Sequence, residues 1–116
     1  MSATDGKITL AEAISWTGNW RGAPSTSARA FLIPLADLQG AVAEIQAQTD
    51  SPMVRAYLAM DGGVEKLVIV GTQKDKNGVY RDLLPAAGEA AGAGTNSIWD
   101  FTDPCPPKCD PSSPLN

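Results

Sequence analysis

The chain has 116 residues and a formal net charge of −4, with nine Lys and Arg against 13 Asp and Glu and no histidine. This length suits one domain. The acidic balance argues against binding to nucleic acid or to an anionic membrane, since both need clustered basic side chains. Without histidine, the chain cannot itself build a Ser-His-Asp or Cys-His catalytic system or a His-containing zinc site. We therefore expect no catalytic residues, no metal site and no cofactor.

The N-terminal stretch also bears on location. Residues 1–16 lack the basic segment followed by an apolar run that marks a signal peptide. No apolar run approaches the roughly 18 residues of a membrane-spanning helix. We expect a cytoplasmic protein, in a compartment where thiols stay reduced.

The first predicted element is a helix that begins after Thr9. Thr9 and Glu12 have the spacing of a capping box, in which the two side chains accept hydrogen bonds from each other's backbone amides. The helix should end near Arg21 and Gly22, because glycine is favoured just past a helix end. One apolar face recurs at helical spacing: Leu10, Ala13, Ile14, Thr17 and Trp20.

Two tryptophans of this helix have two readings. Trp16 and Trp20 could form an aromatic platform for a sugar or a peptide. The core reading is favoured, because large aromatic side chains supply much of a small core and the same face carries Leu10 and Ile14.

A short strand, "ARAFLIPL", is then stopped by Pro34, and a second helix follows over residues 35–48. Gly40 in its middle costs about 1 kcal/mol relative to alanine, which indicates that something packs closely there. One stripe of this helix is predicted to be buried: Leu35, Leu38, Val42 and Ile45. Its predicted partners on the strands are Val54, Leu58, Leu67 and Ile69.

Three strands complete the pattern, over residues 53–60, 66–72 and 79–85. The first two are separated by "DGGVE", an Asp-Gly hairpin signal, and the last two by "QKDKNG". The fragment "DKNG" lacks the later ligands of a calcium loop and predicts a turn instead. The order α-β-α-β-β-β predicts an α+β domain over residues 1–85, with two helices packed on one face of a small, mostly antiparallel sheet.

The remaining residues form a Pro- and Gly-rich C-terminal region. Small residues without periodicity predict a flexible linker over 86–97, followed by a tail over 98–116. The tail could add an extra strand at 98–101 that docks on apolar surface through Ile98, Trp99 and Phe101. Because side chains alternate along a strand, Trp99 and Phe101 are expected to share the inward face.

Cys105 and Cys109 flank "PPK" in the tail. Two thiolates with only Asp103 and Asp110 nearby make a poor zinc site. The spacing differs from the C-x-x-C of redox motifs, and the prolines disfavour a helix start that would lower a thiol pKa. The spacing does permit a disulfide, so we expect a local disulfide under oxidising conditions and free thiols in the cell.

"IWDFTDPCPPKCD" with the final "SPLN", together with the hairpin "VIVG…KNG", resembles a set of small bacterial proteins of uncharacterised function. The resemblance covers the last half of the chain and implies no activity. It implies that the tail is more than random coil.

The leading hypothesis is a small non-enzymatic binding or protein-interaction domain, with a protein partner or self-association. "IWDF" could add as an edge strand to its own sheet or to a neighbour's. One alternative is a metal- or redox-responsive module that uses Cys105 and Cys109. Another is an enzyme based on paired carboxylates, but these residues fall at turns or polar helix positions and predict solvated surface: Asp37, Glu44, Asp61, Glu65 and Asp82.

Overall fold

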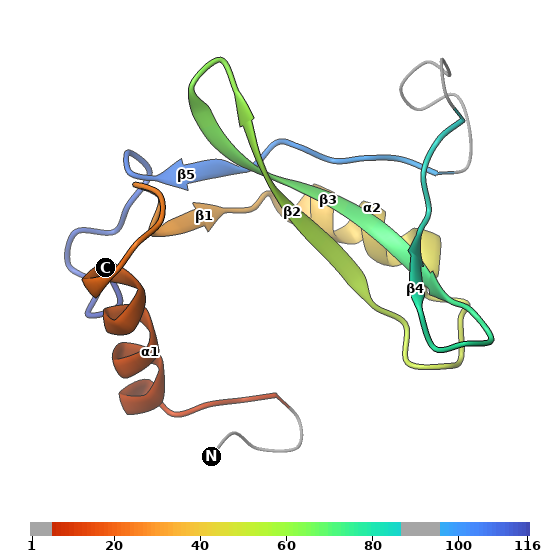
Figure 1. Ribbon diagram of the computed structural model, residues 1–116, viewed down its shortest axis with the longest axis horizontal. Helices are drawn as coiled ribbons and strands as arrows, with labels where there is room; N and C mark the ends of the chain where they lie inside the picture. The colour runs from red at the N-terminus through yellow and green to blue at the C-terminus, as the bar shows by residue number, and fades with distance from the viewer. Residues whose placement is uncertain (1–5, 87–95) are drawn as a thin grey trace. The chain divides into compact units, whose positions relative to one another are not determined.

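The computed structural model describes residues 6–86 and 96–116 and has an α+β fold (Figure 1). Within those ranges it contains two helices and five strands. The chain divides into two compact units, Met1–Phe31 with Pro104–Asn116 and Leu32–Asp103. Most of the linker predicted over 86–97 lies outside the described residues.

The second unit contains an antiparallel sheet in the order β2-β3-β4 (Figure 1). Its strands are β2 (Val54–Asp61), β3 (Val64–Lys74) and β4 (Tyr80–Asp82). Gly62 and Gly63 join β2 to β3 with φ angles of +57° and +82°, the positive region that a tight two-residue hairpin requires. The Asp-Gly hairpin predicted from the sequence is confirmed.

The turn between β3 and β4 is held by Asp75. Its Oδ1 accepts hydrogen bonds from the backbone amides of Asn77, at 2.8 Å, and Val79, at 3.0 Å. Its Oδ2 accepts a bond of 2.9 Å from Arg81 Nε. Gly78 closes the turn at φ +82°. The predicted hairpin turn is therefore confirmed, and the Asp75 side chain is engaged within it.

Helix α2 (Leu35–Ile45) packs on β3 (Figure 1), but with a different face from the predicted stripe. The buried residues are Asp37, Ala41 and Ile45. Leu35 is 67% exposed, and Leu38 and Val42 are exposed too, so the predicted stripe is wrong at all its members except Ile45.

Small residues and one buried hydrogen bond explain the rotation. A Cβ atom built on Gly71 of β3 would lie 2.8 Å from Ile45 Cγ2, so the absence of a side chain there lets the helix approach the strand closely. Asp37 faces inward because its Oδ2 accepts a 3.1 Å bond from the Phe101 backbone amide, which offsets part of the cost of burying a carboxylate. The expectation that Asp37 is solvated is also wrong.

The first unit contains α1 (Leu10–Gly22) and the chain's final residues, with β1 (Ala30–Leu32) and β5 (Asp103–Cys105) forming a separate two-stranded sheet. The predicted capping box is confirmed: the Glu12 amide donates to Thr9 Oγ1 at 3.1 Å, and the Thr9 amide to Glu12 Oε1 at 3.0 Å. The first predicted strand pairs with the tail rather than with the strands of the hairpins.

The apolar face predicted for α1 is not buried. No residue of α1 is buried, and Trp16, Trp20 and Ile14 are exposed. Among the described residues of the first unit, the helix can pack only against β1, the loop before it and the C-terminal residues, too little chain to cover two indole rings. The core reading of Trp16 and Trp20 is therefore wrong.

Candidate functional site

Part of the tail covers one edge of β3. Trp99 and Ile69 exchange two backbone hydrogen bonds, of 2.8 and 3.0 Å, in an antiparallel bridge. Three residues on, the buried Thr102 hydroxyl accepts from the Leu67 amide at 2.8 Å and donates to the Leu67 carbonyl at 3.1 Å. The tail thus satisfies backbone groups of β3 beyond the reach of β4.

The three residues predicted to dock behave differently from one another. The Trp99 indole lies over Gly40, where an added Cβ would come within 2.7 Å of the ring, so Trp99 is the close neighbour that the glycine implied. Ile98 is exposed, and Phe101 is 75% exposed. The expectation that Trp99 and Phe101 share an inward face is wrong, because the segment makes one bridge at Trp99 rather than a regular strand, and strand alternation does not extend to Phe101.

The opposite edge of the sheet is formed by β2, and among the described residues it pairs only with β3. Unpaired edges are normally protected by Lys, Pro, a bulge or a short length. β2 has eight residues in the sequence VRAYLAMD, without Lys or Pro. Its one cation, Arg55, is already bound: Nη1 donates to Asp82 Oδ1 at 2.5 Å and to the Tyr80 carbonyl at 3.0 Å. Within the part of the chain that the structure describes, the edge therefore lacks the usual protection.

Tyr57 also hydrogen-bonds Asp82, through its hydroxyl, and these contacts shift three pKa values. The pKa of Asp82 is lowered, first by the Tyr57 hydroxyl and then by Arg55. The pKa of Tyr57 and that of Arg55 are raised, in both cases mainly by the hydrogen bond to Asp82. The three groups stabilise one another's charge states and form a structural clamp between β2 and β4.

An apolar surface continues from this edge towards the helix. In the β2–β3 register, Val54 lies opposite Gly71 and Leu58 opposite Leu67, so the even-numbered residues of β2 lie on the sheet face that carries α2. Leu58 is 74% and Met60 68% exposed. We define the β2–α2 apolar surface by its exposed members: Leu35, Leu38, Val42, Val54, Leu58 and Met60.

The helix members of this surface lie on the flank of α2 nearer β2. Gly40 faces Trp99, which bridges β3 at the edge away from β2. At 100° per residue, Leu38 and Val42 lie on the other side of the buried line through Ala41. Sequence reasoning identified these residues as apolar but assigned them to the core. The missing protection of β2 was the signal that could have shown its exposure.

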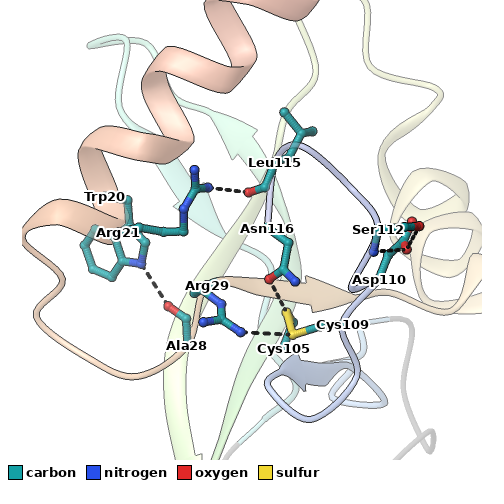
Figure 2. Close-up of a disulfide and its surroundings, with 10 residues drawn as sticks. All are labelled: Trp20, Arg21, Ala28, Arg29, Cys105, Cys109, Asp110, Ser112, Leu115 and Asn116. Carbon is teal, nitrogen blue, oxygen red and sulfur yellow. Dashed lines mark hydrogen bonds between the residues drawn. A yellow bond between two sulfur atoms is a disulfide. The ribbon is translucent and has the colours of Figure 1, made fainter.

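The first unit holds the cysteine pair. Cys105 and Cys109 form a disulfide with a Cα–Cα distance of 4.7 Å (Figure 2). Residues after it form successive turns, in which Asp110 Oδ1 accepts from the Ser112 amide at 3.1 Å and from its hydroxyl at 2.9 Å. Arg29 donates from Nη2 to Cys109 Sγ at 3.7 Å, and its backbone amide to the Cys105 carbonyl at 2.6 Å. The end of the tail is thereby fixed beside β1.

A small pocket lies between α1 and the last residues. Figure 2 draws its lining residues Trp20, Arg21, Arg29 and Leu115. Its volume is about 190 Å³, and its lining residues are Trp16, Thr17, Trp20, Arg21, Arg29 and Leu115. The Trp20 indole donates to the Ala28 carbonyl at 2.9 Å, and Arg21 Nη1 to the Leu115 carbonyl at 2.5 Å. Aromatic and cationic side chains of residues 16–29 thus meet Leu115 at one site.

No family model, curated protein or solved structure matches this chain. Among residues 6–86 and 96–116, no helix is long and apolar enough to cross a membrane. The same residues contain no group of three or more Cys, Asp or Glu side chains arranged to hold a metal ion.

Proposed function

We propose that this protein is a non-enzymatic protein-interaction domain, in which the second unit binds a partner strand along the edge of β2. The observation that carries the proposal is the unprotected edge of this strand beside the β2–α2 apolar surface. Strand addition uses main-chain hydrogen bonds for affinity and alternate side chains for specificity. Here the alternate side chains are Val54, Leu58 and Met60. An apolar surface of this kind is characteristic of interaction sites.

The partner that fits best is a second copy of this chain. If two β2 strands pair antiparallel about Leu58, each Leu58 faces its counterpart, and Ala56 faces Met60 of the second copy. The same register places Arg55 opposite Asp61 of the second copy, twice. Arg55 bonds Asp82 and the Tyr80 carbonyl through Nη1, and its guanidinium has further N–H donors for Asp61. Opposite charges in facing positions stabilise a strand pair, and like charges destabilise it. A register shifted to centre on Tyr57 would instead place Arg55 opposite Ala59 and lose both charge pairs.

Light scattering coupled to size-exclusion chromatography tests this proposal. We expect a particle of twice 12.1 kDa at micromolar concentrations. Leu58→Lys should give a monomer, because two ammonium groups would face each other at the centre of the interface. Leu84→Lys is the matched control: it adds the same charge at an exposed leucine outside the three strands and should remain dimeric. A monomeric wild type, or dimers of Leu58→Lys, would refute the second copy as the partner.

The acidic net charge supports a partner that is protein rather than nucleic acid. The cytoplasm, expected from the sequence, is part of the proposal. In that reducing compartment the Cys105–Cys109 pair would be open, and in an oxidising one it would be closed. The redox alternative is thus a question of location, and thiol titration of protein prepared from cells with rapid alkylation decides it.

A further inference from the structure

The pocket of the first unit has the size of a single ring. Cavities that bind drug-sized ligands have volumes of roughly 300–1,000 Å³, whereas an apolar cavity of about 150 Å³ binds benzene. At about 190 Å³, this pocket suits one ring with a small substituent.

Its two arginines carry charge that the described residues do not neutralise. Arg55, Lys66, Lys74 and Arg81 each pair with an aspartate within 4.0 Å. In contrast, Arg21 donates to the Leu115 carbonyl and Arg29 to Cys109 Sγ, both uncharged acceptors. Each guanidinium has five N–H donors in a planar fork that matches a carboxylate. The pocket is therefore cationic in a chain whose net charge is −4.

Both guanidinium groups also border a second hollow, of about 140 Å³, formed with Pro24, Thr26 and Ser27. The larger hollow in the second unit, of about 400 Å³, differs in charge, because its Lys74 and Asp50 pair with each other at 3.6 Å.

The tryptophans supply the apolar part of the site. The Trp20 indole is held in place by its hydrogen bond to the Ala28 carbonyl. Its ring is partly exposed and lines the pocket, as does Trp16, which is 52% exposed. Indole rings stack on other aromatic rings in offset or edge-to-face arrangements worth about 0.5–1.5 kcal/mol beyond the buried area. Ring and charge are thus recognised within one small volume.

We infer that this pocket is a binding site for a small aromatic carboxylate, whose carboxylate bonds Arg21 and Arg29 and whose ring packs against Trp16 and Trp20. The site lies entirely in the first unit and is independent of the β2 edge. This inference returns to the hypothesis that Trp16 and Trp20 form an aromatic platform, with an anionic aromatic ring as the ligand in place of a sugar.

Titration of the full chain with benzoate tests the inference, read from the indole N–H signals in ¹H–¹⁵N NMR spectra. We expect the Trp16 and Trp20 signals to shift with millimolar affinity, while Trp99, which packs on Gly40 in the second unit, stays in place as an internal control. Benzamide keeps the ring without the charge, and acetate keeps the charge without the ring. Each should bind at least tenfold more weakly than benzoate. Equal affinity for benzoate and benzamide, or shifts at Trp99 alone, would overturn the inference.

Variants assign the charge to its residues. Arg29→Gln should weaken benzoate binding at least tenfold, whereas Lys76→Gln, which removes one positive charge from an exposed turn of the second unit, should leave it unchanged. Arg29→Lys keeps the charge without the fork and should give an intermediate affinity. Dispersed spectra establish that each variant is folded, and the benzamide comparison in the wild type decides the matter if one is not. Unchanged binding by folded Arg29→Gln would also overturn the inference.

Discussion

Gly40 is a residue at which α2 packs directly on the tail. Replacing a mid-helix glycine by alanine ordinarily stabilises a helix by about 1 kcal/mol. Here the new Cβ would lie 2.7 Å from the Trp99 ring, with the indole held by two backbone bonds to Ile69. We expect Gly40→Ala to lower the free energy of unfolding by about 1–3 kcal/mol, as overpacking does, in urea denaturation.

Gly18→Ala provides the matched control for this prediction. Gly18 is also a mid-helix glycine, and its Cβ would meet only Arg21 Nη2, at 3.7 Å. It should be neutral or stabilising, and Trp99→Phe should relieve part of the Gly40→Ala loss. A stabilised Gly40→Ala protein would show that the indole does not pack on α2.

At the scale of elements, the hairpin between β3 and β4 depends on one ionised carboxylate. The pKa of Asp75 is lowered from its ordinary value of 3.8, first by the Val79 amide and then by Arg81. Because the folded-state value is the lower one, this contribution to stability is fully present above the unfolded-state pKa. It is lost as the pH falls through the folded-state pKa.

We therefore expect amide exchange at Gly78 and Val79, corrected for its intrinsic pH dependence, to accelerate as the pH is lowered below about 4. Asp75→Asn should show the faster exchange at neutral pH and lose this pH dependence. If the variant kept the wild-type profile, another group would be responsible for the acid sensitivity.

Elements with local signals could be predicted from the sequence. The Thr9–Glu12 box, the Gly62–Gly63 hairpin and the Asp75 turn each depend on residues within a few positions of one another. The buried face of α2 could not be predicted in this way. It depends on Gly71 and on the Phe101 amide, which are 26 positions from Ile45 and 64 from Asp37. Apolar periodicity identifies the helix but not the neighbour that covers it.

The candidate sites were harder to predict from the sequence for the same reason. Of the three docking residues predicted in the tail, Trp99 packs on another element, while Ile98 and Phe101 are exposed. The pocket brings Trp16 and Arg21 together with Leu115, which is 94 positions from Arg21. No residue spacing in the sequence predicts a contact between positions so far apart. A pairing of residues this far apart becomes visible only when β1 is known to pair with β5.

At the scale of the whole molecule, the disulfide should act locally. Its sequence separation is four residues, and a loop this short restricts few unfolded conformations, so its contribution should not exceed about 2 kcal/mol. We expect a reductant, or the Cys105→Ser/Cys109→Ser double variant, to shift NMR signals of residues 104–116 and α1 while those of β2, β3 and β4 stay unchanged. Loss of signal dispersion throughout the chain on reduction would contradict this.

The first unit is assembled from both ends of the described chain, with the whole second unit between them in sequence. During synthesis, α1 leaves the ribosome before the second unit, while residues 104–116 emerge only after the second unit has been translated. At about 5–20 residues per second, this interval lasts several seconds. Throughout it, Trp16 and Trp20 lack the tail that lines their pocket in the finished protein. The nascent helix thus presents more of these two indole rings to chaperones than the folded protein does, where the tail covers part of them.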